Sequence, residues 1–204
     1  KQFYPAEFHP SRFLAALKDL TLEASDQYSM CCVCNVITKD FEEHCKRSPH
    51  GVCDRRHPTM DDIVQQAVDF AKRCRSDRNK HSACHTLEDD DIYALYVYTL
   101  ETGINSQVNA AMRRDVLSSE DEKWTPIIYH IQRALRKLPP HSLTPLYRSI
   151  NCKVTGYDEG RLLLWQQFSS ATASPHIAKD LTGKGGSLFI LRPSEASQGH
   201  PIDF

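Results

Sequence analysis

The spacing of apolar residues changes about two-thirds of the way along the chain, and this change limits the fold more than any other feature. Up to about residue 138, apolar residues recur every three or four positions, the period of helices with one buried face. Beyond residue 143 they come in short runs bounded by Gly, Pro, Asn or Ser, which is typical of strands. Helices followed by strands predict an α+β fold, with the helices segregated from a mostly antiparallel sheet.

The helical pattern occurs in five segments, which are residues 10–24, 58–74, 88–101, 106–117 and 124–138. Thr59 is a favourable N-cap for the second segment, and acidic residues follow it in the first turn. Three apolar runs are predicted strands, at residues 143–151, 161–170 and 186–193. Between the last two, Ser174 and Pro175 predict the start of a short helix over residues 174–181.

Five of the eight cysteines fall between residues 31 and 53, together with His44 and His50, and His57 follows shortly after. The Cys31-x-x-Cys34 pair, with Cys45 and Cys53 or a nearby histidine, predicts one tetrahedral zinc site. The stretch contains little apolar material, so bound zinc would help it to fold. The spacing matches no standard zinc finger, and two alternatives stay open: disulfides, which an even number of cysteines suits in a secreted protein, and free buried thiols.

The length and net charge of the chain limit the number of domains and the kinds of partner that we expect. The 204 residues suffice for one large domain or for one domain with a small appendage, and we expect an N-terminal part over residues 1–57 and a main domain over residues 58–204. The formal net charge of -1 gives no reason to expect a nucleic-acid partner. The sequence begins at Lys1 without an apolar signal region, so we expect a processed piece of a longer protein. We predict a cytoplasmic location, with secretion as the alternative.

Several segments, in this order and spacing, carry a resemblance to a known family. They are "YALYVYTLETGINSQVNAAMRRD" (93–115), "IIYHIQRALRKLP" (127–139), "LYRSI" (146–150), "LLWQQFSSATAS" (163–174) and "SLFILRP" (187–193) with "GHPIDF" (199–204). Together they resemble the mono-ADP-ribosyltransferases of the arginine–serine–glutamate class. The resemblance covers roughly residues 89–204. It implies N-terminal helices packed on an ADP-ribosyltransferase-type sheet, NAD as co-substrate, and a target protein as the acceptor of ADP-ribose.

The resemblance also implies roles for single residues. The arginine at the end of the family's first sheet strand contacts a phosphate or ribose of NAD, and Arg148 matches it. Ser170 takes the place of the first serine in the family's serine-threonine-serine motif, so Arg148 and Ser170 are the implied catalytic pair. Ser149, Ser169 and Thr172 complete the implied NAD-binding set. The chemistry is reasonable, because a guanidinium forms charge-assisted, forked hydrogen bonds with phosphate oxygens.

Interpretations that give these residues no ligand-binding role also stay open. Arg148 could be a surface residue of a strand, and the hydroxyl residues could simply cap the exit of another. Trp165 and Phe168 are expected to face the core rather than to stack on a ligand. Tyr157 is expected to lie in an ordinary hairpin turn.

The sequence departs from the family pattern at two points. Ser149 stands where the family usually has glycine, whose backbone binds the nicotinamide carboxamide; serine keeps these backbone groups but is less permissive of close approach. The family's catalytic glutamate belongs to a Glu/Gln-x-Glu motif shortly after a segment like "GHPIDF", and residues 1–204 contain no such motif after that segment. Its presence just beyond Phe204 would favour an enzyme, and its absence would favour a binding module. Glu195 lies upstream and does not fit the motif.

The implied reaction cleaves the bond between nicotinamide and ribose and transfers ADP-ribose to a protein side chain, commonly arginine in this family. A carboxylate near the ribose 2′-hydroxyl would stabilise the positive charge that develops on the ring. Two other function classes remain as alternatives. One is an inactive module that binds NAD, and the other is a zinc-organised protein-binding module.

Overall fold

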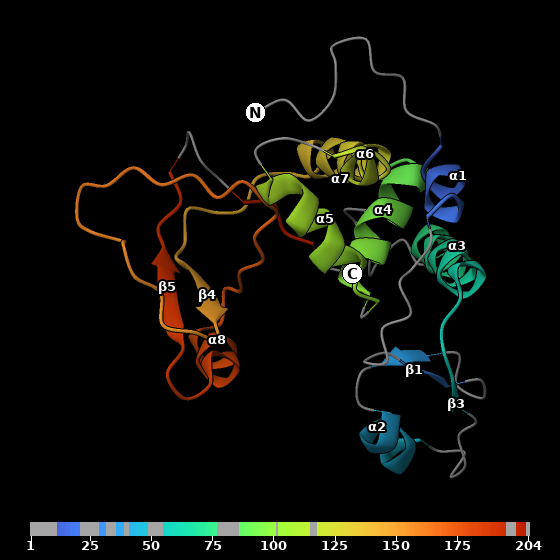
Figure 1. Ribbon diagram of the computed structural model, residues 1–204, viewed down its shortest axis with the longest axis horizontal. Helices are drawn as coiled ribbons and strands as arrows, with labels where there is room; N and C mark the ends of the chain where they lie inside the picture. The colour runs from blue at the N-terminus through green and yellow to red at the C-terminus, as the bar shows by residue number, and fades with distance from the viewer. Residues whose placement is uncertain are drawn as a thin grey trace. The chain divides into compact units, whose positions relative to one another are not determined.

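The computed structural model describes residues 12–20, 29–31, 36–38, 41–48, 55–76, 86–100, 102–114, 118–194 and 199–202 (Figure 1). Residue contacts divide the chain into two compact units. The first unit comprises residues 1–138 and 202–204, and the second comprises residues 139–201. This division differs from the domain boundary that we expected after residue 57. That domain boundary stays a prediction. The elements combine helices with antiparallel strands, so the predicted α+β class is confirmed.

Helices make up most of the described part of the first unit. They are α1 (Phe13–Lys18), α2 (Phe41–Arg47), α3 (Met60–Ser76), α4 (Asp89–Thr99), α5 (Ile104–Arg113), α6 (Ser119–Glu122) and α7 (Thr125–Lys137). Helices are confirmed in all five predicted segments, although residues 10, 11, 21–24, 101 and 115–117 lie outside the described ones. None of the described helices is long and apolar enough to span a bilayer.

Local sequence explains where two of these helices begin. The Thr59 amide donates to the Asp62 carboxylate at 2.7 Å, and the Asp62 amide donates back to the Thr59 hydroxyl at 3.3 Å. This reciprocal capping starts α3 as predicted. Gly103 precedes α5 with φ of 80°, a left-handed conformation that glycine adopts without steric strain. It lets the chain turn into a helix that begins at Ile104, two residues before the predicted start.

The apolar faces of these helices form the core of the first unit. α4 packs on α3 and α7, and α1 contacts all three of these helices. The fully buried apolar side chains come from α1, α3, α4, α5 and α7, and include Phe13, Leu17, Ile63, Ile92, Leu95, Ile104, Ile127, Ile128 and Ile131. Their three- and four-residue spacing in the sequence is the pattern that predicted the helices.

A small antiparallel sheet in the first unit was not predicted. Its strands are β1 (Ser29–Cys31), β2 (Val36–Thr38) and β3 (Arg55–Arg56), in the order β2-β1-β3. Strands of two or three residues are too short to show the alternation of apolar and polar residues that identifies longer ones. Met30 and Ile37 are buried where β1 and β2 pair.

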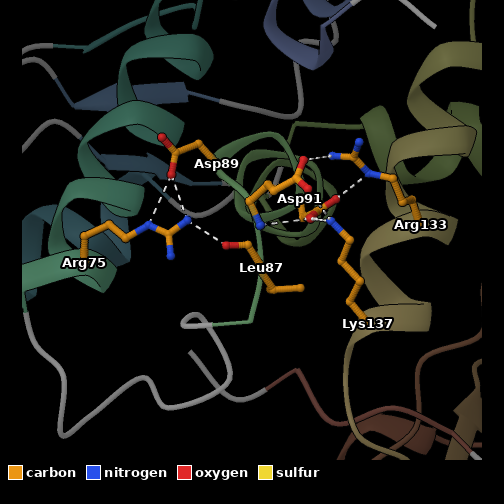
Figure 2. A network of polar contacts seen from close by, with 7 residues as sticks. Arg75, Leu87, Asp89, Asp91, Arg133 and Lys137 are labelled. Carbon is orange, nitrogen blue, oxygen red and sulfur yellow. Dashed lines mark hydrogen bonds and ion pairs between the residues drawn. The ribbon is translucent and has the colours of Figure 1, made fainter. Parts of the chain in front are cut away.

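A buried carboxylate ties α4 to α7. Asp91 is 0% exposed, and it accepts hydrogen bonds from Nε of Arg133 at 2.7 Å and from Nζ of Lys137 at 2.6 Å (Figure 2). Glu88 forms ion pairs with the same two cations. Burial alone would lower the pKa of Lys137, but its hydrogen bonds to Asp91 and Glu88 raise that pKa above its ordinary value. The network fixes the relative position of two core helices.

The second unit contains β4 (Leu146–Ile150), α8 (Pro175–Thr182) and β5 (Ser187–Leu191). β4 and β5 pair antiparallel, and α8 contacts both strands (Figure 1). The strands predicted at residues 143–151 and 186–193 are confirmed. The predicted cap of α8 is also confirmed, because the Ser174 hydroxyl accepts a hydrogen bond from the Ile177 amide at 3.4 Å.

The strand predicted over residues 161–170 is wrong. These residues form neither helix nor strand, and the backbone pairs with β4 only further along, where Tyr147 and Thr172 exchange two hydrogen bonds of 2.8 Å. Leu162 is 97% exposed and Leu164 is 77% exposed. An apolar run becomes a strand only where a neighbouring strand satisfies its backbone groups, and the described residues supply no such partner here.

Candidate functional site

Arg148 lies in the middle of β4, directly across from Phe189 in β5. Its Nη1 donates a hydrogen bond to the backbone carbonyl of Ser170 at 2.7 Å. Its guanidinium carbon lies 5.4 Å from the centroid of the Trp165 ring, which is within cation–π range. The structure therefore brings Arg148 and Ser170 together, as the resemblance implies. The contact uses the carbonyl of Ser170 rather than its hydroxyl.

Three aromatic side chains of the second unit contact one another beside Arg148, and we call them the aromatic platform: Tyr157, Trp165 and Phe189. The Trp165 and Phe189 ring centroids are 5.7 Å apart with the ring planes at 85°, and those of Tyr157 and Phe189 are 4.8 Å apart. Nε1 of Trp165 donates to the hydroxyl of Tyr157 at 2.8 Å. Edge-to-face and tilted arrangements of this kind are favourable aromatic contacts.

The other predicted hydroxyl residues lie in different settings. The Thr172 hydroxyl accepts a hydrogen bond from the Ser174 amide at 3.1 Å, in the turn that leads into α8. This contact supports the interpretation of Thr172 as part of a cap. Ser169 and Ser170 are both exposed beside the point where Arg148 is anchored. Binding of NAD by Ser169, Ser170 and Thr172 stays a prediction.

The side chain of Ser149 lies against α8. Its hydroxyl donates to the carbonyl of Ala178 and accepts a hydrogen bond from the Thr182 hydroxyl at 3.0 Å. Successive side chains of a strand point to opposite faces of the sheet, so Ser149 and Arg148 lie on opposite faces of β4. The extra bulk relative to glycine is thus accommodated by α8, away from the face that carries Arg148. Contact of the Ser149 backbone with NAD stays a prediction.

The predicted zinc ligands are only partly visible. Cys31 lies in β1 and Cys45 in α2, whereas Cys34 and Cys53 lie outside the described residues. Cys45 is a half-buried free thiol. In the part of the chain that the structure describes, no group of three or more His, Cys, Asp or Glu side chains could hold a metal ion. The structure therefore gives no support to the zinc site, which stays a prediction.

Sequence reasoning missed the aromatic platform. Trp165 was expected to face the core and Tyr157 to serve only as a turn residue, but Trp165 is half-buried under the Arg148 guanidinium and Tyr157 is 43% exposed. One signal was available: Trp and Tyr carry polar N–H and O–H groups that need partners when they pack, so they tend to lie at the edges of apolar clusters. A guanidinium stacked on one face and bonded at one edge is well placed to bind a phosphate.

A family model described as NAD:arginine ADP-ribosyltransferase matches residues 25–202, most of the chain. The match includes the Cys/His-rich stretch and, apart from residues 203 and 204, the segments that carry the resemblance. No curated protein and no solved structure matches the chain. Because the match covers more than half of the chain, it shows the family to which the chain belongs. The chain belongs to the NAD:arginine ADP-ribosyltransferase family, whose members use NAD as co-substrate and transfer ADP-ribose to target proteins.

Proposed function

We propose that this chain binds NAD at Arg148 and transfers ADP-ribose to an arginine side chain of a target protein, with release of nicotinamide. The observation that carries the proposal is the Arg148 guanidinium on β4, held by the Ser170 carbonyl and the Trp165 ring in a member of this family. NAD carries two phosphates, and the forked donors of a guanidinium suit phosphate oxygens better than the point charge of a lysine does.

The proposed reaction breaks the bond between the ribose C1′ and the nicotinamide nitrogen, and the bonding electron pair leaves with nicotinamide. Positive charge develops on the ribose ring, and a guanidine nitrogen of the acceptor forms the new bond to C1′ and loses a proton. Arg148 does not take part in bond making. It binds the diphosphate and so holds the ribose where the acceptor can reach it. We assign the stabilising carboxylate to none of the described residues.

The test measures nicotinamide release from NAD together with the mass gain of an acceptor peptide. It uses the 204-residue chain and a longer version that extends beyond Phe204. A polyarginine peptide and a polylysine peptide form a matched pair of acceptors, because both are polycationic and only one carries guanidinium groups. ADP-ribose on the arginine peptide alone is the expected result, and its loss in Arg148→Ala would link it to the site.

Other outcomes separate the alternatives. NAD binding without nicotinamide release by either version would indicate an NAD-binding module that is not an enzyme. Modification of the lysine peptide would keep the transferase activity and overturn arginine as the acceptor. Absence of NAD binding would overturn the proposal as a whole. The cellular location, expected to be cytoplasmic, stays a prediction under every outcome.

A further inference from the structure

We infer that the aromatic platform presets the orientation of Arg148 before NAD binds, with Trp165 and Tyr157 as positioning residues. The inference rests on the proposed function, because it assigns a role to residues that act through Arg148. It concerns side chains to which neither the family match nor the resemblance gives any role.

The contacts form a continuous chain from β5 to the guanidinium. Phe189 in β5 contacts the rings of both Tyr157 and Trp165. The Tyr157 hydroxyl accepts the Trp165 N–H at 2.8 Å and so fixes the rotation of the indole. The indole face then lies under the Arg148 guanidinium at 5.4 Å. Each contact restricts the side chain that follows it, and the last side chain restricted is Arg148, which is proposed to bind NAD.

The geometry suits a planar cation, which can stack with its face and form hydrogen bonds at its edge. Stacking on Trp165 uses a face of the guanidinium, while hydrogen bonds are made at its edge, where one Nη1–H already bonds the Ser170 carbonyl. An arginine side chain is long and loses rotamer freedom when it binds a ligand. A side chain that is already ordered loses less on binding, which raises affinity without any new contact to the ligand.

Burial argues against a purely structural role. Tyr157 is 43% exposed, and the segment that carries Trp165 includes Leu162 at 97% exposure and Leu164 at 77%. A cluster whose only purpose was to form a core would be expected to cover its own apolar neighbours. Here the described neighbours stay in contact with solvent, while the three rings contact one another and the Trp165 ring lies under the Arg148 guanidinium.

The first measurement is the affinity for NAD of single variants. Trp165→Leu removes the cation–π partner and is expected to weaken NAD binding by about two- to fivefold, the range for a stacking contact at an exposed site. Trp165→Phe keeps an aromatic face and should restore part of that loss. Tyr157→Phe removes only the hydroxyl that holds the indole, so its loss should be smaller than that of Trp165→Leu. Leu164→Ala is the control and should bind NAD as the unmodified chain does.

A double-mutant cycle separates positioning from general stability. In an Arg148→Ala background, Trp165→Leu should cause no further loss of NAD affinity, because the group that it positions is gone. A structural role would weaken binding equally in both backgrounds and would overturn the inference. Thermal unfolding of each variant checks the fold. If Trp165→Leu does not fold, the same cycle with Tyr157→Phe decides, because that change keeps the ring.

The outcomes also distinguish this inference from the proposed function. If Arg148→Ala binds NAD as well as the unmodified chain, the proposed NAD site is wrong and the positioning role falls with it. If Arg148→Ala loses affinity while Trp165→Leu and Tyr157→Phe keep it, the site stands and only the positioning role is overturned.

Discussion

Replacing Arg148 should weaken NAD binding more than replacing Ser170, and the structure gives the reason. Arg148 is anchored on the backbone carbonyl of Ser170, so Ser170→Ala leaves that hydrogen bond in place. The serine change removes only a hydroxyl. Arg148→Ala removes a full positive charge and every hydrogen-bond donor that the guanidinium could direct to the two phosphates of NAD.

The expected difference follows from the strength of the two kinds of contact. Hydrogen bonds to charged groups contribute about 1.5–3 kcal/mol, against about 1 kcal/mol for a neutral hydroxyl contact. The gap of about 0.5–2 kcal/mol corresponds to a loss of affinity that is roughly two- to thirtyfold larger for Arg148→Ala. Arg148→Lys should fall between the two, since it keeps the charge but loses the forked geometry.

Calorimetric titration of NAD into each variant measures the difference. Arg161→Ala is the matched control, because it removes another arginine of the second unit, whose Nη1 bonds the Gly156 carbonyl rather than Ser170. Circular dichroism checks that each variant is folded. Equal and negligible losses for Arg148→Ala and Ser170→Ala would show that Arg148 is an ordinary strand residue and would refute the reasoning.

Three further predictions concern stability. Asp91→Asn should lower the free energy of unfolding by about 3–5 kcal/mol, because it breaks a buried ion pair. Asp89→Asn, at a carboxylate that is 60% exposed, should lower it by at most about 1 kcal/mol, and equal losses in urea unfolding would contradict the role of burial. Gly186→Ala should destabilise the second unit by about 1–3 kcal/mol or more, because the new Cβ would overlap the Thr182 carbonyl oxygen and lie 2.7 Å from the Ile150 carbonyl oxygen. An unchanged thermal unfolding temperature would contradict this. The hydrogen bond from Arg56 lowers the pKa of Asp62 from 3.8 to about 2, so the ionised carboxylate stabilises the fold fully above pH 3.8 and this contribution is lost as the pH falls through about 2. The deficit of Asp62→Asn should shrink over that range in urea unfolding, and a deficit independent of pH would rule the explanation out.

The sequence by itself determined the features that depend on near neighbours. The helices could be predicted because one buried face repeats every three or four residues within each segment. Thr59 and Ser174 could be predicted as caps because a capping side chain bonds an amide only three residues away. β4 and β5 were also predictable as short apolar runs between turn residues. The fold class and the position of Arg148 on a strand follow from these local patterns.

The tertiary structure decided which distant residues meet. Trp165 and Phe189 approach Arg148 from segments that local patterns cannot pair, and Asp91 meets its partners Arg133 and Lys137 from more than forty residues away. Residues 161–170 have the composition of a strand, but the described part of the chain supplies no strand that pairs with them, and no local sequence pattern could have shown this. Ser149 lies against α8 because that helix packs on its face of β4. In each case the outcome depends on a partner from another part of the chain, and long-range packing alone supplies it.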